Sequence, residues 1–180
     1  MTCIVGLIDN GRVWMGGDSA GANGDNITLR KDPKVFKNGE FLIGYTSSFR
    51  MGQLLRFKFT PPKYHAEEHN SDEYQYMCTD FIEAVRECLK NGWYDTISNN
   101  EELGGTFLVG FNGRLFEVGG DYQVGEGIDS YDAVGCGQYY AKGSLFSSCL
   151  VSPVEKIERA LKAADYFSGG VRRPFVIESI

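Results

Sequence analysis

The chain has 180 residues, a formal net charge of −6 and a sequence pI of about 5.0. This length suits one domain spanning 1–180 with a substantial buried core. The acidic balance and the scattered lysines and arginines argue against nucleic acid as the main partner. No apolar run reaches the roughly 20 residues of a membrane span, and no signal peptide is evident. We therefore expect a cytoplasmic protein with no membrane partner.

The first half of the chain predicts strands followed by two helices. Two apolar runs flank Asp9-Asn10-Gly11, which is a typical hairpin turn. The expected strands are 3–9, 12–17, 27–30, 34–37 and 40–46. A helix is expected over 47–57, with Ser47 or Ser48 as its N-cap. A second helix is expected over 71–90, with Gly92 after its end. Its apolar face comprises Tyr74, Met77, Phe81, Ile82, Val85, Cys88 and Leu89.

The second half of the chain repeats this pattern. A hairpin is expected over 104–120 with its turn at Asn112-Gly113, followed by a strand near 130–137. Helices are expected over 138–148 and 152–167, the latter with Ser152, Pro153 and Glu155 in an N-terminal capping arrangement. A last strand lies within 171–180. This order of elements predicts an α+β fold, in which two packed sheets lie between helices as a four-layer αββα sandwich.

The histidines and cysteines give no pattern typical of a metal site or a cofactor site. His65 and His69 lie four residues apart in the segment 60–72, which contains prolines and predicts a solvated loop rather than a zinc site. The number of cysteines is odd and their spacing is not that of metal ligands. We expect reduced thiols, no metal and no cofactor. The cysteines are Cys3, Cys78, Cys88, Cys136 and Cys149.

Thr2 is the residue on which the chemical interpretation depends. A small residue after the initiator methionine generally permits removal of that methionine, and removal would give Thr2 a free α-amine. An α-amine has a pKa of roughly 7.7–8.0, so it can act as a base for the hydroxyl of the same residue. Thr2 by itself is much better explained as an ordinary strand residue, so the chemical interpretation rests on the rest of the chain.

Four segments in order carry a resemblance to a known family. They are "TCIVGL...GRVWMGGDSAG", "DPKVFKNGEFLIGYT", "AVGCGQYYAKGSL" and "ADYFSGGVRRPFVIESI". Over nearly its whole length the chain resembles the proteasome β-subunits and the bacterial ATP-dependent heat-shock peptidase. Both are N-terminal nucleophile (Ntn) hydrolases. The resemblance implies the Ntn hydrolase fold.

The resemblance also implies a set of catalytic residues. Thr2 falls on the nucleophile, Asp18 on the conserved acid and Lys34 on the catalytic lysine, at the separations found in the family. Lys34 would stabilise the developing alkoxide, and Asp18 would hold Lys34 in place. Asp165 and Ser168 fall on the pair that orients the amino end of the nucleophile.

Two positions depart from the family pattern. The backbone N–H that would stabilise the oxyanion belongs to a glycine in the family, whereas this chain has Ser47 and Ser48 there. The family usually has a serine where this chain has Cys136, which is followed by Gly137. Cys136 is a weaker hydrogen-bond partner, and we interpret it as a supporting thiol rather than a nucleophile.

The resemblance implies a threonine peptidase that cleaves peptide bonds within a ring-shaped homo-oligomer and receives substrate from an ATP-dependent unfoldase. An Ntn amidohydrolase that acts on small amides is one alternative. A catalytically silent, proteasome-like scaffold or shell protein is another. Residues near the expected pocket mix small, polar and charged side chains, so the sequence leaves the substrate preference open. They are Ala20, Gly21, Asp32, Thr46 and Arg50.

Overall fold

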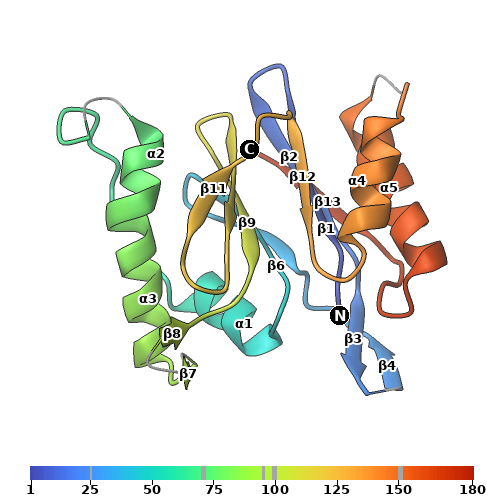
Figure 1. Cartoon of the computed structure of the whole chain (residues 1–180), viewed down its shortest axis with the longest axis horizontal. Coiled ribbons are helices and arrows are strands. Elements are labelled where there is room, and N and C mark those ends of the chain that lie inside the picture. The colour runs from blue at the N-terminus through green and yellow to red at the C-terminus, as the bar shows by residue number, and fades with distance from the viewer. Residues whose placement is uncertain (25, 70–71, 95, 99–100, 150–151) are drawn as a thin grey trace.

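A computed structural model describes residues 1–24, 26–69, 72–94, 96–98, 101–149 and 152–180. Two β-sheets lie face to face in the centre of the molecule, and helices cover each outer side (Figure 1). The helices α1, α2 and α3 lie on one side, and α4 and α5 lie on the other. The predicted α+β sandwich of four layers is confirmed.

The first sheet contains the N-terminal hairpin. Its strand order is β12-β1-β2-β13, and all of its pairings are antiparallel. The turn residues Asn10 and Gly11 have positive φ values of 50° and 74°, which the Asn-Gly sequence favours. The strands are β1 (Ile4–Asp9), β2 (Arg12–Gly17), β12 (Tyr131–Val134) and β13 (Val176–Ser179).

The second sheet contains the other predicted hairpin, which turns at Asn112-Gly113. Its strand order is β11-β10-β9-β6-β5. Every residue of β6 and β9 is buried, because these strands lie in the middle of the sheet between the first sheet and a helix layer. The strands are β5 (Val35–Asn38), β6 (Phe41–Tyr45), β9 (Phe107–Phe111), β10 (Arg114–Val118) and β11 (Val124–Glu126).

Two small ribbons lie outside the main sheets. The pair β3–β4 extends from the end of β2, and β7–β8 follows the helix α3. Of these, only β4 overlaps a strand expected from the sequence, because the other segments lack a continuous apolar pattern. The strands are β3 (Ala20–Asn23), β4 (Asn26–Leu29), β7 (Thr96–Ser98) and β8 (Glu101–Leu103).

The helix predicted over 71–90 forms with an irregular first half, and Ser71 lies outside the described residues. It comprises α2 (Glu73–Tyr76), the π-helical turn η1 (Met77–Phe81) and α3 (Ile82–Asn91), and Gly92 caps its end. A π turn adds one residue, which rotates the residues before it around the helix axis. Tyr76 is therefore fully buried, whereas Tyr74, which we expected on the apolar face, is 39% exposed.

The remaining helices begin and end close to the expected positions. The helix α1 spans Phe49–Phe57 with Ser48 as N-cap. The helices α4 (Gln138–Phe146) and α5 (Pro153–Phe167) cover the first sheet. The Ser152 hydroxyl accepts a hydrogen bond from the Glu155 backbone N–H, as the capping pattern predicts. No helix among the described residues is long and apolar enough to cross a bilayer.

The loop that contains both histidines is more ordered around His69 than a solvated loop would be. His65 is exposed, but His69 is 4% exposed and packs against the rings of Tyr64 and Tyr76. Its Nε2 lies 3.3 Å from a carboxylate oxygen of Asp80. The expectation of a solvated loop is thus wrong for His69, because its ring fills the apolar space beside the helix.

Candidate active site

Thr2, Lys34 and Asp18 lie together in the interior, although the sequence separates them widely. Lys34 Nζ donates hydrogen bonds to Thr2 Oγ1 at 2.9 Å and to Asp18 Oδ1 at 2.8 Å. Thr2 is 5% exposed, and Asp18 and Lys34 are each 2% exposed. Thr2 precedes β1, Asp18 follows β2 and Lys34 precedes β5. The ends of three strands therefore assemble the group.

Backbone N–H groups hold the Asp18 carboxylate in a fixed orientation. Oδ1 accepts from the Cys3 N–H at 3.0 Å. Oδ2 accepts from Ala20 N–H at 2.9 Å and from Arg172 N–H at 3.2 Å. Together with the Lys34 ammonium, these N–H groups engage both carboxylate oxygens of Asp18. Asp18 is thus a rigid negative charge against which the Lys34 ammonium is positioned.

The burial of Lys34 affects the pKa of its ammonium group. Removal of the ammonium from water lowers the pKa of Lys34, and the hydrogen-bonded Asp18 carboxylate opposes that decrease. The ammonium is directed at the Thr2 hydroxyl oxygen, so it lies where negative charge would develop if that oxygen attacked a carbonyl group. A buried cation in this position stabilises an alkoxide far better than one in water.

Cys136 lies at the backbone nitrogen of Thr2, and Ser168 lies next to Cys136. The Thr2 N–H donates to Cys136 Sγ at 3.3 Å, and the same sulfur lies 3.3 Å from Ser168 Oγ. Gly137 N–H donates to the Thr2 carbonyl oxygen at 3.4 Å. A Cβ at Gly135, where φ is +98°, would lie 2.3 Å from that oxygen. The turn between β12 and α4 can therefore approach Thr2 only because residue 135 is glycine.

Asp165 has different partners from those that the resemblance implies. Its carboxylate accepts a hydrogen bond from Arg173 Nε at 3.1 Å and lies 3.8 Å from Arg172 NH1. Within the described residues it makes no hydrogen bond to Thr2. Asp165 thus ties the end of α5 to the segment that leads into β13. Its role at the nucleophile stays a prediction.

The turn between β6 and α1 distinguishes the two serines that were expected to supply the oxyanion donor. Ser47 has a φ of +64°, in the left-handed region that glycine favours. Among the hydrogen bonds of the described residues, none uses the Ser47 N–H, whereas the Ser48 N–H donates to the Thr46 carbonyl oxygen at 2.7 Å. The Ser48 hydroxyl caps α1. The N–H that is free to bind an oxyanion is that of Ser47.

Met1 covers one side of Thr2. The Thr2 hydroxyl donates to the Met1 carbonyl oxygen, and the Met1 side chain lies against Gly170, where a Cβ would approach it to 2.3 Å. Met1 is 54% exposed. In this form the Thr2 nitrogen is a peptide N–H and has no basic lone pair. Removal of Met1 would convert that nitrogen into an amine.

Solved structures with the same fold identify the architecture. BPH from Thiobacillus denitrificans, in complex with epoxomicin, matches with a TM-score of 0.81 at 17% identity, over 99% of this chain and 98% of that one. The chain has the proteasome-like Ntn hydrolase fold. Eukaryotic HslV from Trypanosoma brucei matches with a TM-score of 0.69 at 17% identity, over 99% and 98% of the two chains.

A third match is an Anbu mutant from a Hyphomicrobium species, with a TM-score of 0.67 at 17% identity over 98% of this chain and 80% of that one. No protein-family model and no curated protein matches the sequence. The fold that the sequence motifs implied is confirmed. The chemical roles rest on the contacts of the side chains described above.

In this Ntn hydrolase fold, a small pocket opens beside Thr2. Its volume is about 50 Å³. Of the residues expected near the pocket, Thr46 lines it. Ala20, which is fully buried, and Gly21, Asp32 and Arg50 are not among its lining residues. Ala22, Tyr45 and Phe49 were not singled out from the sequence, because nothing in their local pattern separates a pocket wall from a core position. The lining residues are Met1, Thr2, Ala22, Tyr45, Thr46, Ser47, Ser48 and Phe49.

Proposed function

We propose that the protein is a threonine-type peptidase of the proteasome family, a single domain over 1–180 that cleaves peptide bonds through Thr2 after removal of Met1. The observation that carries the proposal is the buried chain of hydrogen bonds from Asp18 through Lys34 to the Thr2 hydroxyl. A plain surface ion pair would gain little free energy and would not be buried against a hydroxyl group.

The reaction would begin at the Thr2 hydroxyl. The free α-amine accepts the hydroxyl proton while Oγ1 forms a bond to the substrate carbonyl carbon. The Lys34 ammonium stabilises the developing charge on Oγ1. The Ser47 N–H supports an oxyanion on the former carbonyl oxygen. The peptide C–N bond then breaks, and the amine passes its proton to the leaving nitrogen, which leaves an ester on Thr2.

Hydrolysis of the ester would complete the cycle. Water gives a proton to the Thr2 amine and attacks the ester carbon, so that the carboxylic acid product leaves and the hydroxyl group re-forms. Cys136 supports this step because its sulfur lies at the Thr2 nitrogen, where it can orient the amine, and Ser168 contacts that sulfur. This step uses the same donor groups as the first, and it requires neither a metal nor a cofactor.

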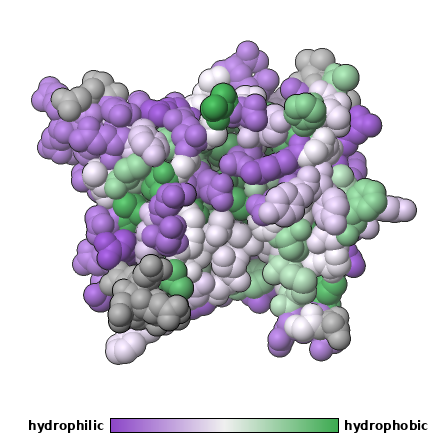
Figure 2. Space-filling view, viewed as in Figure 1, coloured by the Kyte–Doolittle hydropathy of each residue, from purple (hydrophilic) through white to green (hydrophobic). Residues whose placement is uncertain are grey.

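The proposal includes a second copy of the chain as a partner, in a ring-shaped homo-oligomer, and an ATP-dependent unfoldase that supplies protein substrate. Exposed aromatic side chains on α4 and α5 support self-association, since a soluble monomer rarely exposes a contiguous apolar patch. Figure 2 shows hydrophobic residues among the hydrophilic surface on that side. The aromatic residues are Tyr139, Tyr140, Phe146, Tyr166 and Phe167.

The experiment that tests the function is the intact mass of untagged protein before and after incubation with a peptide epoxyketone or boronate. We expect loss of Met1 and one covalent epoxyketone adduct on Thr2. The variant Thr2→Ala would remain unmodified, whereas Thr2→Ser, which keeps a hydroxyl group, would react.

Retention of Met1 together with no adduct from any probe would contradict the peptidase proposal and favour the silent scaffold. An adduct on Thr2 combined with turnover of small amides but not of peptides would favour the amidohydrolase. The two alternatives are thereby separated from the peptidase in the same preparation.

A further inference from the structure

Phe49 forms a wall of the pocket beside Thr2. It is the first residue of α1 and is partly buried. Its ring lies under the guanidinium of Arg30, with Cζ 3.8 Å from the ring centroid, and contacts the ring of Tyr45 edge-on with centroids 5.9 Å apart. Lys34 Nζ lies 5.6 Å from the same ring. Phe49 thus lies beside both Arg30 and the Lys34 ammonium.

A second pocket lies on the other side of this wall. Its volume is about 330 Å³, compared with about 50 Å³ for the pocket that contains Thr2. Ala22 and Phe49 line both pockets, and only Phe49 has a side chain large enough to divide them. The lining residues of the second pocket are Gly21, Ala22, Asn23, Thr28, Arg30 and Phe49.

The packing around the wall fixes its position. A Cβ at Gly52 would lie 2.2 Å from the Tyr45 ring, so this ring lies directly on the α1 backbone. A Cβ at Gly21 would lie 2.7 Å from Arg30 Cδ, so Arg30 also packs on bare backbone. Asp32 binds the Arg30 guanidinium through two hydrogen bonds of 2.8 and 2.7 Å, which keeps that group over Phe49.

Met1 also lines the small pocket and lies against Gly170. Removal of Met1 would therefore open the pocket on that side and leave the wall formed by Tyr45 and Phe49 in place. An apolar cavity of about 150 Å³ binds one benzene ring. With Met1 in place the pocket of about 50 Å³ holds a methyl or hydroxymethyl group but not an aromatic side chain, and after removal of Met1 the wall formed by Tyr45 and Phe49 still bounds it.

We propose that Phe49 determines specificity by restricting the substrate residue whose carbonyl group is attacked to a small side chain, such as that of alanine or serine. The inference rests on the proposed peptidase function and adds its substrate class. Replacement of Phe49 by alanine would join the small pocket to the larger one, and the variant would then accept large side chains.

The test uses peptide epoxyketones that differ only in the residue bearing the reactive group: alanine, leucine or phenylalanine. With protein that has lost Met1, we expect the alanine probe to modify Thr2 at least about tenfold faster than the phenylalanine probe. In Phe49→Ala this order would reverse. Phe49→Leu would give intermediate rates. If Phe49→Ala does not fold, the preference of the wild-type protein for the alanine probe over the phenylalanine probe tests the inference by itself.

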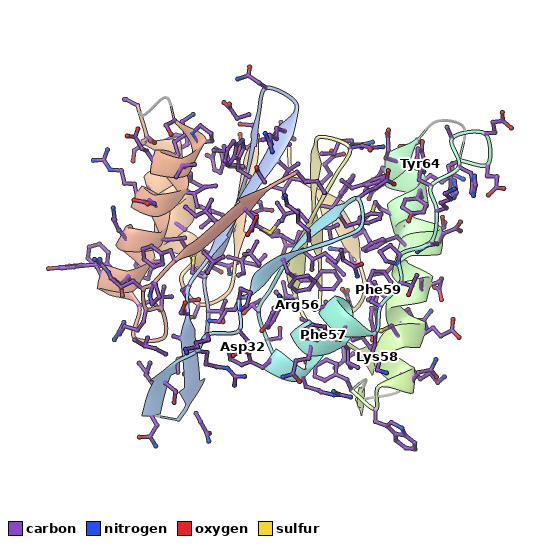
Figure 3. All side chains as sticks on the ribbon, turned by 180° about the vertical axis from the view of Figure 1, so that it is seen from behind. Asp32, Arg56, Phe57, Lys58, Phe59 and Tyr64 are labelled. Atoms are coloured by element: carbon purple, nitrogen blue, oxygen red, sulfur yellow. The ribbon has the colours of Figure 1, made fainter. Side chains whose placement is uncertain are left out.

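The matched control is Phe57→Ala. Phe57 is the last residue of α1 and is 71% exposed. In Figure 3, Phe57 is labelled to the right of Asp32, the residue that binds Arg30. This control should keep the wild-type order of rates. Equal or faster modification by the phenylalanine probe in wild-type protein would overturn the inference while the proposed function stands. Absence of any adduct from all three probes would overturn both.

Discussion

At the scale of single residues, the buried pair of Lys34 and Asp18 is the feature that ordinary folding requirements explain least. A buried ion pair often contributes no more to stability than apolar residues of the same volume would. Its cost here is offset by the backbone donors around Asp18. The ammonium also contacts Thr2 Oγ1, which an apolar replacement could not do. The pair is therefore better explained by chemistry than by stability.

Lys34→Met should reduce the rate of Thr2 modification about 100- to 1000-fold, because the cation that stabilises the alkoxide is lost. It should also reduce the free energy of unfolding by about 3–5 kcal/mol, since Asp18 loses its partner. Mass spectrometry over time and urea unfolding measure the two effects. Lys37→Met is the matched control, because Lys37 is exposed on the neighbouring strand β5. Unchanged reactivity in Lys34→Met would exclude the lysine from the reaction.

The exposed thiol of Cys136 leads to a second prediction at the scale of single residues. Its thiol contacts the Thr2 nitrogen, and the residue is exposed. Alkylation should therefore block the Thr2 site. Cys136→Ser should keep activity within about tenfold, because a hydroxyl group makes the same hydrogen bonds, and should be insensitive to the alkylating reagent. A wild-type protein that stays fully active after complete alkylation of Cys136 would contradict the contact.

At the scale of elements, the turn that leads into α1 combines a strained residue with a helix cap. Ser47 adopts φ = +64°, and its hydroxyl accepts a hydrogen bond from the Thr106 N–H at 3.0 Å. That bond offsets part of the cost of the left-handed conformation. Ser48 begins the helix. The sequence predicted that one of these serines is the N-cap, and the structure assigns that role to Ser48.

Ser48→Ala should reduce the free energy of unfolding by about 1 kcal/mol through loss of the N-cap. Ser47→Gly should leave the rate of Thr2 modification within a few-fold of wild type, since the proposed oxyanion donor is the backbone N–H. Chemical denaturation and the epoxyketone assay measure these outcomes. A large loss of reactivity in Ser47→Gly, in a protein of normal stability, would assign the function to the hydroxyl group instead.

At the scale of the whole molecule, glycines allow the two sheets to approach each other. A Cβ at Gly44 on β6 would lie 2.4 Å from Met15 Sδ and 2.6 Å from Ile4 Cγ2, and both of these residues belong to the opposite sheet. The separation of the sheets in turn fixes Lys34, which precedes β5, relative to Thr2, which precedes β1. Packing between the sheets thus connects stability to the geometry of the site.

Gly44→Ala should reduce the free energy of unfolding by about 1–3 kcal/mol because of overpacking, and should also slow Thr2 modification. The control is Gly125→Ala on β11, where a Cβ would meet nothing within 4 Å. Urea unfolding of both variants measures the difference. Equal free energies of unfolding for the two variants would mean that the sheets move apart to accommodate the added methyl group at no cost in stability.

Alkaline pH should destabilise the fold in part through Tyr76. Burial raises the pKa of its phenol, so the folded state keeps a proton that the unfolded state loses above about pH 10. Stability is therefore lost as pH rises, by up to about 1.4 kcal/mol per pH unit from this group. Relative to Tyr76→Phe, wild-type protein should lose stability between pH 9 and 11 in urea titrations. Parallel pH profiles of the two proteins would contradict the burial effect.

The sequence by itself determined most of the elements and singled out the group that we propose to be catalytic. Asn-Gly turns and alternating apolar residues are local signals, so they predicted both hairpins. The resemblance of the motifs to the proteasome family predicted that Thr2, Asp18 and Lys34 form one group, and the hydrogen bonds among them agree. The resemblance also predicted Asp165, Ser168 and Cys136 near the amino end of Thr2. Cys136 contacts the Thr2 nitrogen and Ser168 contacts Cys136, whereas Asp165 binds Arg173.

Only the tertiary structure decided the features that depend on distant packing. The π turn buries Tyr76 instead of Tyr74, because insertion of one residue changes the face of a helix without changing its composition. The proposal that Ser47 rather than Ser48 supplies the oxyanion N–H depends on which of the two N–H groups has no hydrogen-bond partner among the described residues. The wall formed by Tyr45 and Phe49 depends on Arg30 and Gly52, which contact it from separate elements. A local sequence pattern cannot encode such contacts, since they exist only once the layers have packed together.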